Sequence, residues 1–251
     1  DHITNTAVQI QLFEALAGSG SLPVFGHHNL LTSATGEGLS KRSGALSIGT
    51  LRESGIESLA LAAFAVLTGT SASVHPVQSL DELAAALDLS HVSRNQARFD
   101  PAELAGLSSR TLHQLPYETV RHRLLMHDIT GHKAEAFWYA VRGNLVVFLD
   151  VVEWWRILEG EIVPVREDPE LLDTARDLLP AEPWDGSTWA QWVAALKARS
   201  SRKGRALFHP LRLALTGREE GPELAALLPL IGRLKAEARL SAPGVLLHRG
   251  Q

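Results

Sequence analysis

The chain has 251 residues, of which 45% are hydrophobic and 21% charged, and its formal net charge is −4. This composition is typical of a soluble globular protein of one to three domains, and the charge argues against indiscriminate binding of nucleic acid. The lack of cysteine excludes a disulfide framework, a thiolate metal site and a cysteine nucleophile, and without a bilayer-spanning run or a signal peptide we expect a cytoplasmic protein with no membrane contact.

The first 50 residues contain the strand signals and one helix. Apolar residues at helical spacing predict a helix over residues 4–16. Residues 23–26 and 45–48 are interpreted as short strands. Residues 36–45 between them form a basic, glycine-rich segment, whose backbone freedom suits close approach to a phosphate. Alone, such a segment is more typical of a solvated turn.

From residue 57 onward the sequence predicts helices joined by short loops. Ser79 opens a capping box, and Asp100 and Asp168 each precede a proline at a helix start. Gly143 falls inside a long apolar pattern, where it is a candidate kink. The expected helical segments are residues 51–55, 57–67, 83–87, 101 onward, 116–126, 132–158, 169 onward, 187 onward, 204–215, 222–228 and 230–240.

The histidine positions predict no metal site, and the tryptophan positions predict packing between helices. His27 and His28 are adjacent and would point to opposite faces of a strand, which is a poor start for a shared metal. The pair that begins at Trp154, and the spaced pair Trp189 and Trp192, are typical of packing between helices rather than of base stacking.

The charges are distributed unevenly along the chain. Residues 197–218 contain lysine and arginine but no acid, whereas acidic residues gather between Glu153 and Asp185. A basic face on an acidic body suits a partner whose phosphates dock in one orientation. A solvated helix face is the alternative interpretation.

Short motifs along the chain occur in the order found in one protein family. They are Asp1-His2-Ile3-Thr4-Asn5-Thr6 with Gln9, the segments 23–31, 39–42 and 47–55, Lys203-Gly204, the segment 210–217, Gly221-Pro222, and the segment 230–232. In this order they resemble the C-terminal half of a bacterial glutamyl-tRNA synthetase, a class I aminoacyl-tRNA synthetase. Leu39-Ser40-Lys41-Arg42 is similar to the KMSKS loop of that class, although Gly38 stands where the family has a lysine.

The resemblance implies a mainly α fold. A small α/β remnant of the class I catalytic domain would be followed by an all-helical stem-contact region and an α-helical anticodon-binding bundle. The implied domains are residues 1–31 for the Rossmann-type remnant, 32–117 for the KMSKS-like loop and stem contact, and 118–251 for anticodon binding, with a subdomain split near residue 178 left open. No segment resembles the family's HIGH motif, so we expect a fragment that is inactive alone.

The resemblance also implies the chemistry of the parent enzyme, which attaches glutamate to tRNA(Glu) using ATP, with Mg in the intact enzyme. Lys41, assisted by Ser40, would stabilise the negative charge of the departing pyrophosphate. No cofactor is expected to be tightly bound by this chain. The residues implied at the ATP site are Lys41, Arg42, Gly38, Asp1 and His2, with Lys41 and Ser40 catalytic.

For tRNA, the resemblance implies that Arg212 faces the anticodon. Either Asn144 or Arg142 would occupy the position that discriminates the third anticodon base, so acceptance of tRNA(Gln) beside tRNA(Glu) stays open. The candidates for phosphate contact, which orients without specifying sequence, are Lys197, Arg199, Arg202, Lys203 and Arg205. We expect a monomer. The alternatives are a non-catalytic tRNA-binding or assembly module derived from this family, and a purely structural protein-interaction domain.

Overall fold

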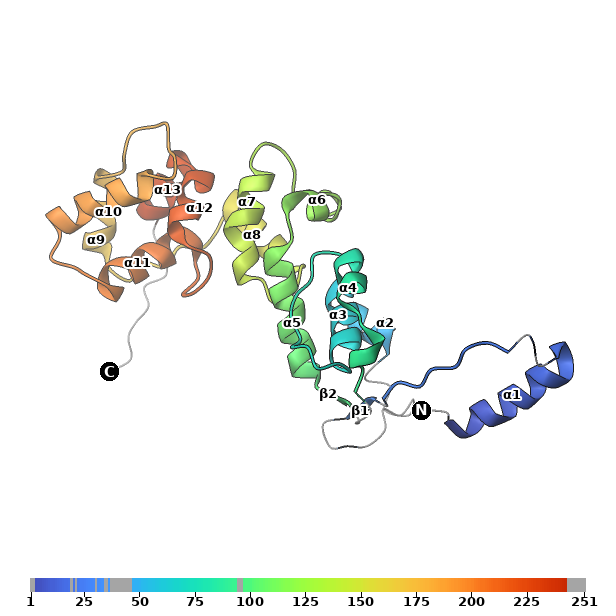
Figure 1. Cartoon of the computed structure of the whole chain (residues 1–251). Helices are drawn as coiled ribbons and strands as arrows, with labels where there is room; N and C mark the ends of the chain where they lie inside the picture. Colours follow the sequence, from blue (N-terminus) through green and yellow to red (C-terminus); the bar gives the residue numbers. More distant parts are fainter. Residues whose placement is uncertain are drawn as a thin grey trace. The chain divides into compact units, whose positions relative to one another are not determined.

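The computed structural model describes residues 3–18, 20, 22–29, 31–33, 36, 47–93 and 97–242. The chain divides into two compact units, Asp1–Thr111 and Leu112–Gln251. Helices dominate the described residues of both units, and one small parallel sheet lies in the first (Figure 1). The predicted mainly α fold with a small α/β remnant is therefore confirmed. No described helix is both long and apolar enough to cross a membrane.

The first unit is built around helix α3 and the sheet. Strand β1 (Leu31–Ser33) pairs in parallel with β2 (Ala97–Phe99), with Leu31 opposite Ala97. Phe64 of α3 packs edge-to-face on Phe99, with ring centroids 5.4 Å apart. The helices of this unit are α1 (Ile3–Ala17), α2 (Ile48–Glu53), α3 (Ser58–Leu67), α4 (Leu80–Ala86), the 3-10 turn η3 (Leu89–His91) and most of α5 (Pro101–Gln114).

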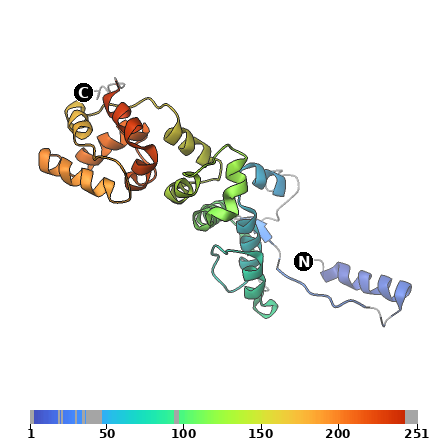
Figure 2. The same cartoon turned by 90° about the horizontal axis from the view of Figure 1, so that it is seen from above.

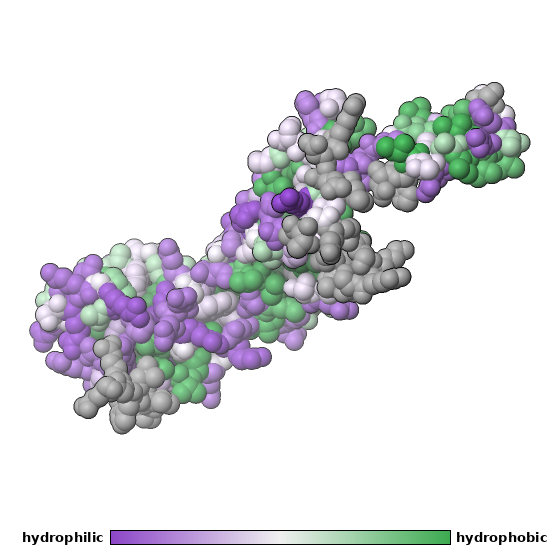
Figure 3. Space-filling model, turned by 90° about the horizontal axis from the view of Figure 1, so that it is seen from below, coloured by the Kyte–Doolittle hydropathy of each residue, from purple (hydrophilic) through white to green (hydrophobic). Residues whose placement is uncertain are grey.

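Helix α1 confirms the helix predicted over residues 4–16, but it buries none of its residues. Leu12 and Leu16 are among its exposed apolar side chains. Figure 3 shows hydrophobic surface, in green, along this helix. The strand expected over residues 23–26 is wrong: residues 22–29 have no regular structure. The strand expected over 45–48 is wrong where it is described, because the Ser47 hydroxyl accepts from the Thr50 N–H at 3.0 Å and opens α2 instead.

The helices and 3-10 turn named in the second unit are joined by loops over its described residues. Helices α9 to α13 gather into one bundle, with α7 and α8 packed against α12 (Figures 1 and 2). Trp192 is fully buried and donates its indole N–H to a backbone carbonyl at 2.9 Å, and Trp154, Trp155 and Trp189 pack partly buried against the same core, which confirms the predicted packing between helices. The elements are α6 (Tyr117–Leu125), α7 (Ala134–Val141), η4 (Arg142–Asn144), α8 (Asp150–Glu159), α9 (Pro169–Asp177), α10 (Thr188–Arg199), α11 (Arg205–Thr216), α12 (Leu224–Ile231) and α13 (Arg233–Ser241).

The breaks before α8 and before α13 fall elsewhere than expected. The single helix expected over residues 132–158 is wrong: the 3-10 turn η4, which contains Gly143, follows α7, and α8 begins again at Asp150. The Asp150 carboxylate accepts the N–H groups of Val146 and Val147 at 2.8 and 3.0 Å, which fixes the turn that leads into the new helix. Near the C-terminus the break falls at Gly232, whose φ of +78° ends α12, whereas Pro229 lies inside that helix.

Candidate nucleic-acid interface

Six residues are implied at the ATP site, and they lie outside the described residues: Asp1, His2, Gly38, Ser40, Lys41 and Arg42. The site that the structure does describe lies in the second unit, where the basic segment of the sequence forms the end of α10, a loop and α11.

Arg212 projects from α11 and is half-buried. Its Nη1 donates to the carbonyl oxygen of Pro222 at 3.0 Å. Burial lowers the pKa of the guanidinium below its ordinary value, although an arginine stays charged at neutral pH. Within the described part of the chain, no carboxylate lies within 4.0 Å to form an ion pair with Arg212. The side chain is therefore a partly desolvated cation with a single carbonyl partner, which is costly unless a further acceptor arrives.

Two small hollows meet at Arg212. One, of about 230 Å³, is also lined by Arg205, Phe208, His209, Glu219 and Glu220. The other, of about 210 Å³, is also lined by Trp189, Phe208, Glu223, Leu224 and Ala225. The rings of Trp189 and Phe208 lie 6.1 Å apart and 33° from parallel. Flat rings, an arginine and carboxylates together can stack a planar base and pair with its edge.

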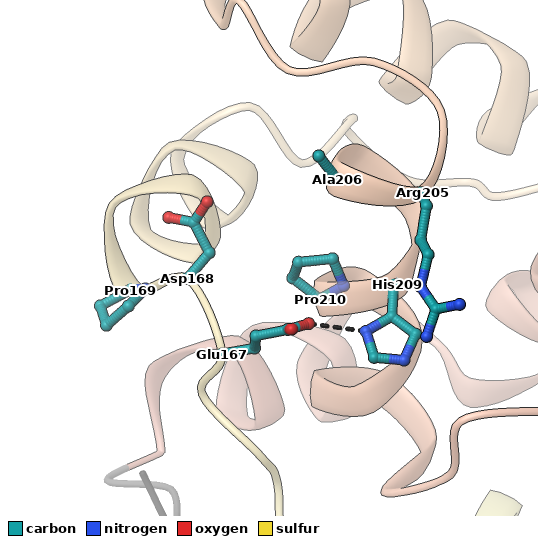
Figure 4. A pocket seen from close by; sticks show the side chains of 7 residues that line it. All are labelled: Glu167, Asp168, Pro169, Arg205, Ala206, His209 and Pro210. Carbon is teal, nitrogen blue, oxygen red and sulfur yellow. Dashed lines mark hydrogen bonds and ion pairs between the residues drawn. The ribbon is translucent and has the colours of Figure 1, made fainter. Parts of the chain in front are cut away.

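A larger hollow, of about 760 Å³, lies between the start of α9 and α11 (Figure 4). His209 Nδ1 and Glu167 Oε2 lie 2.6 Å apart there, and only 16% and 17% of the two side chains is exposed. Arg205 and Asp168 line the same hollow. No pattern in the sequence predicts this His–Glu pair, because its members are 42 positions apart.

The five candidate phosphate contacts differ in their surroundings. Arg202 is already engaged: its Nε and Nη2 donate to both oxygens of Asp168, and Nη2 also reaches Glu170 at 3.0 Å. These hydrogen bonds, first of all that with Asp168, raise the pKa of Arg202. The other four are exposed, and they are Lys197, Arg199, Lys203 and Arg205. Exposed cations in one segment can contact a phosphate backbone without strict geometry.

Arg142 and Asn144 both lie in the turn η4, and the structure distinguishes them. Arg142 donates through Nη1 to the carbonyl oxygen of Leu115 at 2.8 Å, and its guanidinium lies 4.8 Å from the ring centroid of Tyr139. Asn144 is exposed. The arginine thus holds the turn in place while the asparagine faces outward.

Comparisons with known proteins agree with this arrangement. Residues 163–242 match the family model of an anticodon binding domain, and residues 1–105 match that of the catalytic domain of class I tRNA synthetases (E and Q). The chain is 72% identical over 241 residues to glutamate–tRNA ligase 2 of Beijerinckia indica, an alignment that covers 96% of this chain and 54% of that protein. The chain belongs to the glutamate–tRNA ligase family.

Other members of the family match over the same span. Glutamate–tRNA ligase 2 of Methylorubrum populi is 54% identical over 241 residues, which is 96% of this chain and 53% of that protein. The chain thus spans about half the length of the curated relatives it matches. The solved structure of the glutamate-tRNA synthetase of Elizabethkingia anophelis has a TM-score of 0.71 at 18% identity, covering 95% of this chain and 54% of that one, which shows the shared fold.

Proposed function

We propose that this chain is the tRNA-binding half of a cytoplasmic glutamate–tRNA ligase, which attaches glutamate to tRNA(Glu) using ATP and Mg. Support comes from the family membership and from the match of residues 163–242 to an anticodon binding domain. We propose that residues 1–31 are the remnant of the catalytic domain, residues 32–117 the KMSKS-like loop with the stem-contact region, and residues 118–251 the anticodon-binding domain. Lys41 and Ser40 remain the proposed catalytic residues, with Gly38, Arg42, Asp1 and His2 at the ATP site.

The first unit offers a further argument for a larger parent protein. Helix α1 exposes a row of apolar side chains, among them Leu12 and Leu16, to solvent. An apolar patch of this kind is typical of a surface on which another part of a protein packs. We propose that the rest of the class I catalytic domain packs on this helix. The chain alone is then expected not to activate glutamate, and a monomer is proposed for the parent.

The observation that carries the anticodon proposal is the state of Arg212. A half-buried guanidinium with one carbonyl partner, placed where two hollows with aromatic walls meet, is prepared to donate to an unpaired base. Lys197, Arg199, Lys203 and Arg205 would contact phosphates, while Arg202 braces the start of α9. For the third anticodon base, we propose Asn144 as the reading residue and Arg142 as its support.

Filter-binding titrations test this proposal with transcripts of tRNA(Glu) that differ only in one anticodon base, at two salt concentrations. We expect the chain to bind the unaltered transcript about 10- to 100-fold more tightly, and Arg212→Gln to lose most of that ratio. Arg233→Gln is the matched control, because Arg233 is also half-buried, with one hydrogen bond to the Pro180 carbonyl, but lines neither hollow. Equal binding of both transcripts by the unmodified chain would refute the proposal.

A further inference from the structure

The carbonyl that holds Arg212 belongs to a short loop, residues 217–223, between α11 and α12. Gly217 ends α11 in the left-handed conformation, at φ +67°. The Thr216 hydroxyl donates to the Arg212 carbonyl at 2.8 Å and accepts the N–H of Arg218 at 3.2 Å, so the loop folds back over the last helical turn. This return brings the Pro222 carbonyl onto the Arg212 guanidinium.

The other side of the loop is fixed by α8. A Cβ atom added at Gly221 would overlap Cη2 of Trp154 and lie 2.5 Å from its Cζ2, and the φ of Gly221 is +138°. Only glycine fits such a close approach at this backbone angle. One position earlier on α8, Glu153 forms an ion pair with Arg218 of the same loop. Two neighbouring residues of α8 therefore contact the loop at two points, Trp154 at Gly221 and Glu153 at Arg218.

We propose that Trp154 and Gly221 are positioning residues for anticodon reading: the indole ring sets the loop, the loop sets the Pro222 carbonyl, and the carbonyl sets the direction of the Arg212 guanidinium. This inference rests on the proposed function of Arg212. Helix α8 also follows the turn that contains Asn144. The same helix would thus keep the two base-reading parts of the domain in a fixed relation.

A role confined to packing makes a different prediction. If the contact only stabilised the fold, Gly221→Ala would lower the thermal midpoint but leave the ratio of affinities for the two transcripts unchanged. If the contact positions Arg212, the ratio falls in folded protein. Binding to the altered transcript, which depends on phosphate contacts, would then change little.

The experiment is a double-mutant cycle in the full chain, with Gly221→Ala, Trp154→Phe and the combination. Phenylalanine lacks the outer indole atoms that the new Cβ would meet, so the combined variant relieves the overlap. We expect each single change to lower the affinity ratio about 5-fold or more and the combination to recover part of that loss, because the overlap is relieved while an alanine at φ +138° stays strained. Gly131→Ala is the control, since its φ of +85° also strains an alanine whereas a Cβ there meets no atom within 4 Å.

Several outcomes decide the question. Circular dichroism at the assay temperature establishes that each variant is folded, and NMR of the arginine side-chain N–H groups of the free chain follows Arg212 without tRNA. An unchanged ratio and an unchanged Arg212 signal in folded Gly221→Ala would overturn the inference while the anticodon proposal stands. A lowered ratio without rescue in the combined variant would also overturn it. If the unmodified chain bound the unaltered and the altered transcript equally, the proposed function itself would be refuted.

Discussion

Two arginines of the second unit are withdrawn from water, and their surroundings are opposite. Burial lowers the pKa of both Arg212 in α11 and Arg239 in α13. Arg239, which is 6% exposed, donates to the carbonyl oxygens of Leu215, Ile157 and Gly160 at 2.7, 2.6 and 3.1 Å. Arg212 donates to one carbonyl and borders two hollows.

The difference indicates which buried arginine builds the fold and which can bind a ligand. The carbonyls around Arg239 belong to the last turns of α8 and α11, where the helix dipole favours a cation. Its hydrogen-bonding capacity is used within the protein. Arg212 uses only one of its N–H groups in a hydrogen bond among the described residues. A buried arginine therefore identifies a binding residue only when most of its N–H groups lack acceptors within the protein.

The largest expected effect comes from removing Arg239. In Arg239→Met three carbonyls lose their donor, two of them in buried hydrogen bonds, and we expect the free energy of unfolding to fall by about 3 kcal/mol. Arg212→Met should cost about 1 kcal/mol or less, because a single carbonyl is affected. Urea unfolding followed by tryptophan fluorescence measures both, since all six tryptophans lie in the second unit. Equal losses in the two variants would contradict the distinction.

Sequence reasoning succeeded where the determining contact is local. Ser79 and Asp168 cap their helices through N–H groups three residues away, so the signal lies within one turn. It failed at η4, because the apolar spacing continues through the break and only Gly143 hints at it. The strand β2 was missed because three residues carry too little pattern.

The candidate site was predictable only in part. The basic segment and the motif around Arg212 can be read directly, whereas burial and partners depend on residues distant in sequence. Arg202 meets Asp168 across 34 positions, and the Pro222 carbonyl reaches Arg212 through a loop whose path depends on Trp154. No periodicity encodes such contacts, so the sequence cannot separate a paired arginine from one available to RNA.

A smaller effect is expected at Glu159, which lies beside Arg239 at the end of α8. Burial alone would raise the pKa of this carboxyl, but hydrogen bonds from Lys235 and Lys133 outweigh it and lower the pKa. A carboxylate with a lowered pKa stabilises the fold above its ordinary pKa of 4.5, and this contribution is lost as the pH falls through the folded-state pKa.

Glu159→Gln should therefore lower the free energy of unfolding by about 1 kcal/mol at neutral pH, a figure reduced for solvent screening of partly exposed groups. The difference from the unmodified chain should shrink toward zero as the pH falls below 4.5 and through the lowered pKa of Glu159. Urea unfolding at several pH values measures it, with the exposed Glu135→Gln as control. A difference that stays constant down to acidic pH would show that the ion pairs with the two lysines are not its source.

The smallest expected effect concerns two neighbouring cations, Arg202 and Lys203. As with Arg239 and Arg212, one has its acceptors within the protein and the other can meet a ligand. Arg202 is paired with Asp168 and Glu170, whereas Lys203 is exposed. Lys203→Ala should weaken binding of all transcripts alike, by about 2- to 3-fold, and reduce the slope of log affinity against log salt by about 0.7 to 0.9, the value of one phosphate contact. Arg202→Ala should leave that slope unchanged, because its charge is already neutralised within the protein. If both variants changed the slope equally, internal pairing would not govern which cations meet the RNA.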